Sequence, residues 1–426
     1  MSIKALFPQN LKNSYHLSQA VLANIRYGFP SRKIKVIGIT GTNGKTTTSQ
    51  MIAKILEESG ARVAMISTIN FKMGEKEWVN KTKFTTVSAY ETQKFIAQAV
   101  KAKCEYLVLE TSSHSLDQSR VWGVKYASAV ITNVTREHLD YHATMEEYRR
   151  VKLRLFRSVK TAIVNLDMEQ PEEFLNCGAK NVYVYTTKND TAELKDKKIK
   201  TVQARNIKLG IDGSEFEIDR HKFKINLPGL FNVENALAAI CVGISQKIDL
   251  EKIKKALAKI TKVVGRMDEV ENALGVKIII DYAVTPDSLE KLGALIIEQK
   301  TAKQSLIWVF GSCGDRDKGK RPIMGEIVSN CANYVFVTNE DPYGEDPQII
   351  IDAVFSGVVK NKKLKENQNC WRILDRRLAI SSALKLAKPG DIILVTGKGA
   401  EEIMQVGKEK IPWNDRRVIE EELKKI

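Results

Sequence analysis

The feature that most constrains the fold is a glycine-rich segment, GITGTNGKTTTSQ, at residues 38–50. A β-branched run, KVIGIT, leads into it and a helix-forming run follows, which is the strand–loop–helix order of a phosphate-binding loop. Gly41 and Gly44 allow a tight turn that aims backbone N–H groups at phosphate. Lys45 would reach the terminal phosphates, and the Thr46 hydroxyl would meet Mg²⁺. The segment therefore predicts a nucleotide-binding domain, with a Gly-x-x-Gly-Lys-Thr spacing shorter than the usual one.

The composition indicates a soluble globular protein. The 426 residues suffice for two or three domains, and 43% of them are hydrophobic. Six cysteines are dispersed without a CxxC pair, which argues against a zinc site or a disulfide framework and favours a reducing cytoplasm. No apolar run approaches the roughly 18 residues of a membrane span, and no signal peptide is visible.

A formal net charge of +16 leaves nucleic acid, anionic membranes and anionic small substrates open as partners. Much of the excess lies in short lysine clusters at 195–200 and 360–365, which are typical of solvated loops and helix ends. No helicase-like motif set and no aromatic–basic interleaving accompanies the charge. We therefore expect small-molecule substrates and no nucleic acid.

Residues 1–33 predict a short N-terminal helical segment. Leu17, Val21, Leu22 and Ile25 recur at helical spacing, with basic residues nearby. One interpretation is a helix packed on the main domain. The other is a basic amphipathic helix that makes peripheral contact with a membrane surface.

The remainder of the chain predicts an α/β protein with two domains. Residues 34–265 alternate apolar strands with helices, as in a central P-loop ATPase domain with a mostly parallel sheet. Within it, the alternating runs SEFEID and HKFKINL suggest antiparallel strands at a sheet edge. A second alternation, over residues 266–426, predicts a smaller, Rossmann-like α/β domain at the C-terminus.

Polar clusters follow several strands, at the edge where open α/β sheets bind ligands. Glu110 closes the strand EYLVLE and is placed to hold a metal ion near the phosphate loop. The segment TNVTREHLDYH contributes His138, and Lys152 lies in the helix after it. In the C-terminal domain, Arg316 and Glu401 suit an amino acid, because arginine pairs with a carboxylate and glutamate with an ammonium.

Taken together, these motifs resemble the Mur ligase family, in its UDP-N-acetylmuramoyl-tripeptide synthetase branch. The resemblance covers residues 35–426 and rests on eight segments in the family's order: GTNGKTT, ETSSHSLDQSR, TNVTREHLDYH with MEEYRRVKLRLF, LPGLFNVENALAA, GRMDEV, DYAVTPDS, GDRDKGKRPIMGE and GKGAEE. It implies an ATP-dependent ligase of cell-wall peptide synthesis that adds an amino acid to a muramoyl-peptide carboxylate through an acyl phosphate.

The resemblance also implies residue roles. ATP binding is implied for Gly41, Thr42, Asn43, Gly44, Lys45, Thr46, Thr47, Asn232, Asn235, Arg266, Asp281 and Tyr282. Mg²⁺ and catalysis are implied for Lys45, Thr46, Glu110, His138 and Lys152, the last as a carbamate. The acceptor is assigned to Thr85, Thr86, Ser112, Gln118 and Arg120, and the amino acid to Arg316, Asp341, Tyr343, Gly397 and Glu401.

The sequence departs from the family pattern at several motif positions. Val87, Val284 and Ala400 replace a proline and two histidines, and Tyr343 stands where diaminopimelate-adding enzymes carry an arginine. The change at Tyr343 disfavours diaminopimelate and favours lysine, ornithine or another amine, whose distal ammonium could meet Asp341, Glu345 or Asp346.

Only about 37 residues precede the phosphate loop, where the family usually has roughly a hundred that bind the uridine nucleotide. We therefore expect either weak UDP recognition or a lipid-linked or other non-UDP acceptor, and a monomeric protein. Two alternatives are a catalytically silent nucleotide-binding partner and a ligase similar to folylpolyglutamate synthase. Retention of Lys45, Glu110, His138 and Lys152 argues against the first, and the segments SSHSLDQSR and GDRDKGKRP argue against the second.

Overall fold

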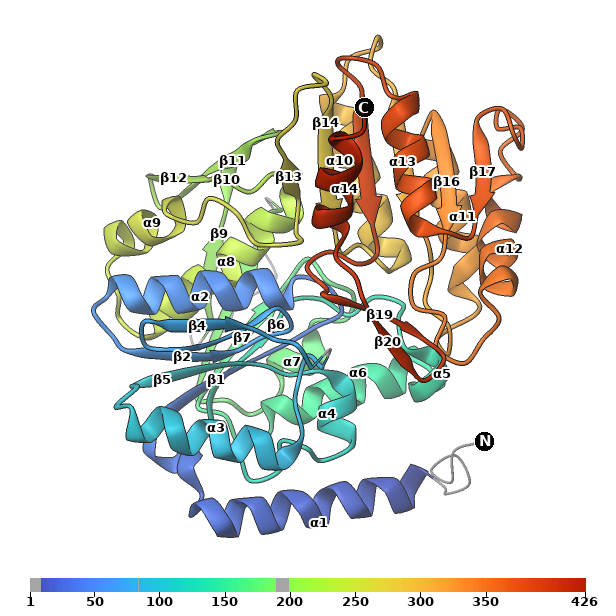
Figure 1. Cartoon of the computed structure of the whole chain (residues 1–426). Helices are drawn as coiled ribbons and strands as arrows, with labels where there is room; N and C mark the ends of the chain where they lie inside the picture. Colours follow the sequence, from blue (N-terminus) through green and yellow to red (C-terminus); the bar gives the residue numbers. More distant parts are fainter. Residues whose placement is uncertain (1–8, 83, 189–198) are drawn as a thin grey trace. The chain divides into compact units, whose positions relative to one another are not determined.

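The computed structural model describes residues 9–82, 84–188 and 199–426, which form two units (Figure 1). The first unit comprises the residues up to 135 together with 144–261, and the second comprises 136–143 with 262–426. The first eight residues of the predicted N-terminal segment, and residues 195–198 of one lysine cluster, lie outside the described residues. The predicted domain boundaries, at 33/34 and 265/266, stay predictions.

The first unit is built on a nine-stranded sheet in the order β4-β3-β2-β5-β1-β6-β7-β8-β9. Its strands are β1 (Lys35–Thr40), β2 (Val63–Ile66), β3 (Asn70–Met73), β4 (Lys76–Val79), β5 (Tyr106–Glu110), β6 (Tyr126–Ile131), β7 (Thr161–Asn165), β8 (Asn181–Thr186) and β9 (Ile199–Gln203). Across the sheet from β2 through β5, β1, β6, β7 and β8 to β9, all neighbouring strands are parallel. At the other edge, β3 pairs antiparallel with both β2 and β4. Strands buried on both faces read as continuous apolar runs, as the central strands of this sheet do.

Helices cover both faces of this sheet (Figure 1). One face carries α2 (Lys45–Glu58), α8 (Leu230–Ser245) and α9 (Leu250–Ala258). On the other lie α3 (Ala89–Lys101), α4 (Ser113–Asp117), α6 (Met145–Leu153) and α7 (Glu172–Leu175). A hydrophobic core lies between this second face of the sheet and its helices, and it includes residues of β1, β5, β6, β7, α3, α4, α6 and α7. The predicted α/β architecture is confirmed.

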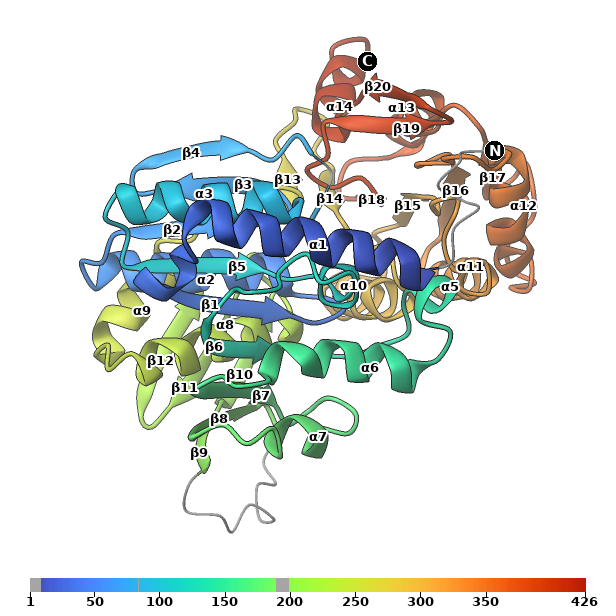
Figure 2. The same ribbon diagram turned by 90° about the horizontal axis from the view of Figure 1, so that it is seen from below.

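The N-terminal helix α1 (Gln9–Tyr27) lies along α3 on the outside of the first unit (Figure 2). It makes this contact through small and polar side chains, because Ala20, Ala23 and Asn24 are the residues it buries. Leu22 and Ile25, which the sequence placed on the apolar face, are 66% and 62% exposed. The predicted helix is present, but it packs through a different face.

The alternating runs after residue 204 form their own three-stranded antiparallel sheet, β10 (Arg205–Gly210), β11 (Gly213–Ile218) and β12 (His221–Ile225). The predicted antiparallel pairing is confirmed, but these strands form a sheet of their own and are not an edge of the nine-stranded sheet, whose edge strands are β4 and β9. Phe216 and Phe223 stack with ring centroids 5.3 Å apart on the buried side of β11 and β12. That side packs against α8 and α9, which explains why the alternation has a period of two.

The second unit has a six-stranded sheet in the order β13-β14-β18-β15-β16-β17. Its strands are β13 (Asp268–Val270), β14 (Lys277–Asp281), β15 (Leu306–Phe310), β16 (Tyr334–Thr338), β17 (Cys370–Ile373) and β18 (Ile392–Thr396), all parallel except β13. Its helices are α5 (Leu139–His142), α10 (Pro286–Gln299), α11 (Lys320–Cys331), α12 (Pro347–Val358), α13 (Arg376–Leu386) and α14 (Asp415–Leu423). A hairpin of β19 (Ile403–Val406) and β20 (Glu409–Pro412) precedes α14.

Two further observations concern the chain as a whole. The six cysteines are free thiols. Within the described ranges, no helix has the length and apolar character needed to cross a bilayer.

Candidate active site

The nucleotide half of the site is the loop between β1 and α2. Gly41 and Gly44 have φ values of 151° and 82°. A Cβ at either position would lie on a neighbouring oxygen, 1.8 Å from Thr132 Oγ1 or 2.2 Å from Asn235 Oδ1. Only glycine fits such positions, so the loop lies close against its neighbours before α2 begins at Lys45.

Asn133, which follows β6, fixes the shape of this loop. Its carbonyl accepts a hydrogen bond from Thr42 N, and its Oδ1 accepts one from Asn43 N, both at 2.9 Å. The Lys45 ammonium folds back over the loop and donates to two of its carbonyls, at 2.8 and 3.0 Å. Asn133 and Lys45 therefore hold the loop in shape at the N-terminus of α2, and the N-terminus of a helix is where phosphate groups bind.

Glu110, at the end of β5, is buried and faces the start of α2. Thr46 Oγ1 donates to its two oxygens at 3.1 and 3.2 Å. Thr68 donates both its amide and its hydroxyl to the same carboxylate, each at 2.8 Å. Thr47, next along α2, is buried as well. The structure thus brings the predicted metal ligands Thr46 and Glu110 together, and it adds Thr68, which the sequence gave no reason to select.

This arrangement fits Mg²⁺. Within the described part of the chain, no three His, Cys, Asp or Glu side chains gather as a metal site. Mg²⁺ usually binds through one or two carboxylates, with phosphate oxygens and water completing its shell. One buried carboxylate with a hydroxyl beside it, next to a phosphate loop, is that kind of donor set.

The five residues assigned to the acceptor are Thr85, Thr86, Ser112, Gln118 and Arg120. Thr86 contacts two of the others, Ser112 and Arg120: its Oγ1 donates to the Glu110 carbonyl at 3.1 Å and accepts from Ser112 N at 3.0 Å. Arg120 donates to the Thr86 carbonyl at 2.8 Å, and the Thr85 and Thr68 hydroxyl oxygens lie 3.1 Å apart. Ser112 caps α4 at its start, and Gln118 is the residue at its end. Thr85, Thr86 and Ser112, three of the residues assigned to the acceptor, therefore lie close to Glu110 at the end of β5.

Asn232 and Asn235, assigned to the nucleotide, lie in the first turns of α8. Asn235 Oδ1 accepts from Thr48 Oγ1 at 3.2 Å, and Asn235 Nδ2 donates to Asn232 Oδ1 at 3.2 Å. Asn232 in turn donates to the Pro228 carbonyl at 2.8 Å. In this structure the pair links α8 to α2 beneath the phosphate loop.

Lys152, the residue assigned as a carbamate, is buried on α6. Its Nζ lies 4.2 Å from the centroid of the Tyr148 ring. The Tyr148 hydroxyl is 3.3 Å from Thr42 Oγ1 in the phosphate loop. Tyr148 therefore connects the lysine to the loop, a role that one aromatic residue in a helix did not reveal from the sequence.

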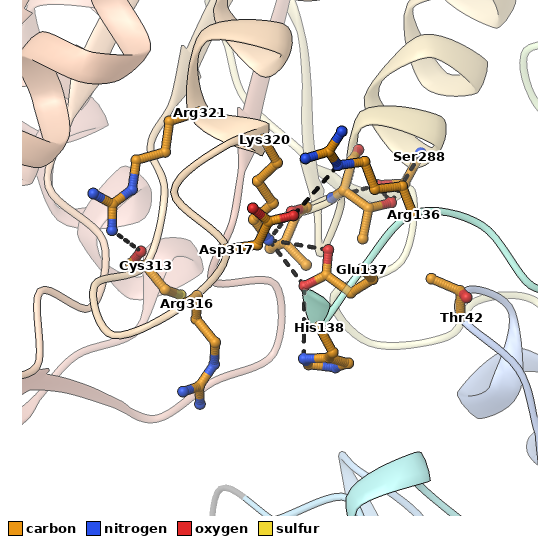
Figure 3. A network of polar contacts seen from close by, with 12 residues as sticks. Thr42, Arg136, Glu137, His138, Ser288, Cys313, Arg316, Asp317, Lys320 and Arg321 are labelled. Atoms are coloured by element: carbon orange, nitrogen blue, oxygen red, sulfur yellow. Dashed lines mark hydrogen bonds and ion pairs between the residues drawn. The ribbon is translucent and has the colours of Figure 1, made fainter. Parts of the chain in front are cut away.

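A short segment of the second unit, residues 136–143, carries His138 (Figure 3). The buried Lys320 ammonium donates to both oxygens of Glu137, at 2.9 and 3.1 Å, and to the Val284 carbonyl at 2.9 Å. Arg136 pairs with Asp317 at 3.4 Å. Burial on its own lowers the pKa of Lys320, but the neighbouring groups, Glu137 first among them, together raise this pKa above its usual value.

His138 itself has a left-handed backbone, φ 57°, and starts α5, with Nδ1 4.0 Å from Glu137 Oε1. The family pattern groups His138 with Glu110 round one metal ion. These two residues belong to different units, so their pairing stays a prediction.

The C-terminal nucleotide residues meet in one place. The Arg266 guanidinium lies 4.4 Å over the Tyr282 ring. Asp281 accepts a hydrogen bond from Met267 N at 2.8 Å, and burial raises the pKa of its carboxyl. Tyr282 Oη is 3.5 Å from Glu401 Oε1, which joins this group to the residues assigned to the amino acid.

Two of the residues assigned to the amino acid, Asp341 and Glu401, contact a lysine that sequence reasoning missed. Lys398 is fully buried and donates to Asp341 Oδ2 at 2.9 Å and to Glu401. Burial on its own lowers the pKa of Lys398, but Glu401 and Asp341 together raise it well above its usual range. Arg316 lies 5.1 Å over the Tyr343 ring. Membership of the loop GKGAEE was the signal that could have identified this lysine.

A second missed residue, Glu340, lies under the same loop. Gly397 has φ 114°, and a Cβ there would be 2.6 Å from Glu340 Oε2. Glu340 Oε1 accepts from the Cys313 thiol at 2.9 Å, whereas Oε2 has no hydrogen-bond partner among the described residues. Burial raises the pKa of this carboxyl.

The three acids considered for a distal ammonium already have partners. Asp341 accepts from Lys398 and from Gln405 N, at 2.9 and 2.6 Å. Glu345 accepts from Arg321 at 2.9 and 3.1 Å. Asp346 caps α12. Among the described residues near this loop, Glu340 is therefore a buried acid that keeps an unbonded oxygen.

Comparison with known proteins identifies the family that combines these features. Residues 39–243 match the family model of the Mur ligase middle domain, and residues 265–399 match that of the Mur ligase glutamate ligase domain. A UDP-N-acetylmuramoyl-L-alanyl-D-glutamate–2,6-diaminopimelate ligase of Syntrophomonas wolfei is 38% identical over 414 residues, covering 95% of this chain and 81% of its own. The chain belongs to the Mur ligase family.

Solved structures agree with this assignment. A structure of a UDP-N-acetylmuramoyl-L-alanyl-D-glutamate–2,6-diaminopimelate ligase matches with a TM-score of 0.59 and 29% identity, over 92% of this chain and 78% of its own. Mycobacterium tuberculosis folylpolyglutamate synthase, complexed with ADP and AMPPCP, matches with a TM-score of 0.70 over 89% and 92% of the two chains. At 17% identity the latter likeness shows the fold alone. The Mur ligase fold predicted from the motifs is thereby confirmed.

Proposed function

We propose that this Mur ligase activates the carboxylate of a muramoyl-peptide acceptor with ATP and joins it to an amino acid. The observation that carries the proposal is the cluster at the end of β5. There, the buried Glu110 faces Thr46 of the phosphate loop, and its own carbonyl contacts Thr86 of the acceptor group. ATP phosphates and the acceptor carboxylate would therefore meet on either side of one carboxylate.

The chemistry follows from the charges that must meet. An acceptor carboxylate attacks the γ-phosphate, and ADP leaves as an acyl phosphate forms. Lys45 and the amides of the phosphate loop would offset the charge on the phosphates. The amine then attacks the acyl carbon, giving a tetrahedral species that expels phosphate. Mg²⁺, held by Thr46 and Glu110, would supply further charge neutralisation, with His138 as a ligand in the family pattern.

A carbamate on Lys152 is part of this proposal. Reaction of the neutral amine with CO₂ releases a proton and converts a buried cation into a carboxylate that can support a metal site. The intact mass of the protein in CO₂-saturated buffer should rise by the mass of one CO₂, about 44 units, when Lys152 is carbamylated. Lys152→Met is the control and should show no such increase.

For the incoming amino acid we propose a diamine such as lysine or ornithine. Tyr343 supports this choice. It stands at the position where diaminopimelate-adding enzymes carry an arginine that binds the distal carboxylate, and here its ring contacts Arg316 instead. The buried, partly unbonded carboxyl of Glu340 also supports it. Equal turnover of lysine and diaminopimelate would contradict the proposal.

The deciding experiment is amino-acid-dependent phosphate release with ATP and Mg²⁺. UDP-muramoyl-dipeptide serves as acceptor against a panel of amino acids. Release with one amino acid, lost in Lys45→Ala by a factor of about 100 or more, would support the ligase. If the protein bound nucleotide but released no phosphate with any amino acid, the proposed reaction would be contradicted for this acceptor. A monomeric state and a cytoplasmic location remain parts of the proposal.

A further inference from the structure

Helix α1 carries an apolar stripe on the side that α3 does not cover. Leu11, Tyr15, Leu22 and Ile25 follow one another along one helical face and are 57%, 60%, 66% and 62% exposed. The opposite face is occupied, since Ala20 and Ala23 are buried. Four large apolar side chains in one line, on one solvent-facing helix, are more than scattered exposure.

The polar atoms within this stripe are already bonded inside the helix. Ser18, which lies between Tyr15 and Leu22 on the same face, donates its hydroxyl to the Tyr15 carbonyl at 2.8 Å. The Tyr15 hydroxyl accepts from Gln19 at 2.8 Å. Neither group therefore loses its hydrogen bond when the face leaves bulk water, which lowers the cost of burying it.

Basic side chains flank the stripe without acidic ones among them. Residues 1–33 contain five basic and no acidic residues, in a chain of net charge +16. Lys12 and Arg26 lie on α1, and Arg32 and Lys33 are exposed just beyond it. Asp117, an acid that contacts α1, accepts a hydrogen bond from Asn13 and is paired with Arg154. The charge around the stripe is therefore positive.

We propose that this face of α1 docks on an anionic lipid bilayer. The helix would lie in the membrane plane, with the stripe at the headgroup–acyl boundary and the basic residues at the phosphates. A second copy of the chain fits less well, because a symmetric α1–α1 contact would bring Lys12 and Arg26 of both copies together. The proposal concerns only this surface and does not depend on the ligase reaction.

Flotation of the full chain with vesicles tests the proposal. Vesicles of about 30% phosphatidylglycerol in phosphatidylcholine should carry the protein at low salt and release it at high salt. Leu22→Ser with Ile25→Ser should weaken this binding at least about tenfold, since the apolar contact is lost. Lys12→Gln with Lys33→Gln should weaken it by about fivefold for each charge removed.

A matched control is the double variant Ile349→Ser with Leu378→Ser. These residues are 61% and 56% exposed, on helices of the second unit, and should leave vesicle binding unchanged. Melting temperatures within about 2 °C of the parent protein would show that all variants fold. Equal vesicle binding by every variant would overturn the proposal, and so would equal binding to pure phosphatidylcholine vesicles. The proposal would also fail if the parent protein bound no vesicles and formed a dimer that the Leu22→Ser, Ile25→Ser variant could not form.

Discussion

At the scale of single residues, the carboxylate of Glu110 depends on its neighbours for its orientation. Two threonines from separate parts of the chain, Thr46 and Thr68, donate three side-chain and backbone groups to it. Thr46 is also a proposed metal ligand, whereas Thr68 acts on the site only through Glu110. Thr68 is therefore a positioning residue, whose contribution can be separated from direct metal binding.

Thr68→Val should raise the Mg²⁺ concentration needed for half-maximal activity about tenfold, since second-shell partners of metal ligands typically contribute that much. The variant keeps the backbone N–H bond to Glu110 but loses the hydroxyl bond at 2.8 Å. Mg²⁺ titration of phosphate release, together with nucleotide binding measured without Mg²⁺, would separate the two effects. Thr201→Val, an exposed strand position, is the control and should change neither. Loss of metal-free nucleotide binding in Thr68→Val would contradict a positioning role.

The Glu345–Arg321 pair should make the stability of the second unit depend on pH. Hydrogen bonds from the Arg321 guanidinium lower the pKa of Glu345 from 4.5 to about 2. A folded-state pKa below the unfolded one stabilises the protein above pH 4.5, and this contribution is lost as the pH falls toward 2. Glu345→Gln should therefore cost about 2 kcal/mol at neutral pH, and the difference should shrink through that acidic range.

Thermal melting at a series of pH values, followed by tryptophan fluorescence, measures this dependence. At neutral pH the Glu345→Gln variant should melt about 6 °C lower. Glu366→Gln removes an exposed partner of Arg372 and should cost less than about 0.5 kcal/mol. A Glu345→Gln difference that stays constant down to pH 2 would contradict the assignment.

What the sequence could predict at this scale depended on distance along the chain. The phosphate loop is one continuous motif, and Glu110 closes an apolar strand, so both were visible. The partners of the missed residues are remote: 42 residues separate Thr68 from Glu110, and 183 separate Lys320 from Glu137. No local pattern records a pair of that kind, because only the folded sheet brings its two members together.

At the scale of elements, the strands of both sheets could be predicted because burial on both faces demands long apolar runs. The short β3 and β4, and the separate sheet of β10–β12, could not be placed, since an alternating pattern shows that one face is buried without showing against what. For α1 the sequence predicted the helix but not its buried face. Ala20 and Ala23 allow close approach to α3, so small size decided the contact, and the larger apolar residues were left outside.

At the scale of the whole molecule, the chain passes between its two units at three points, near residues 135, 143 and 261. The second unit therefore includes a segment, 136–143, that lies far from the rest of it in sequence. The buried contact of Lys320 with Glu137, and that of Arg136 with Asp317, hold this segment in place (Figure 3).

Lys320→Met should loosen residues 136–143, because it leaves the Glu137 carboxylate buried without its cation, at a cost of about 3 kcal/mol. Hydrogen exchange of the amides of Tyr141 and His142, which donate to the His138 carbonyl, should accelerate roughly 100-fold. Mass-spectrometric exchange on the full chain would measure this. Lys318→Met removes a 73% exposed neighbour and should leave the exchange unchanged. Unaltered protection in Lys320→Met would show that other contacts hold the segment.

This interleaving of the chain limits how the protein can be recombined. A chimera that takes residues 262–426 from a relative would import a new partner for Glu137 while keeping the old Glu137, and with it the old His138. Such an exchange transfers only part of the second unit, because this unit is encoded by two separate stretches of the chain, 136–143 and 262–426. A working chimera would have to transfer residues 136–143 together with the C-terminal block, so that the lysine and the glutamate that face each other come from the same parent.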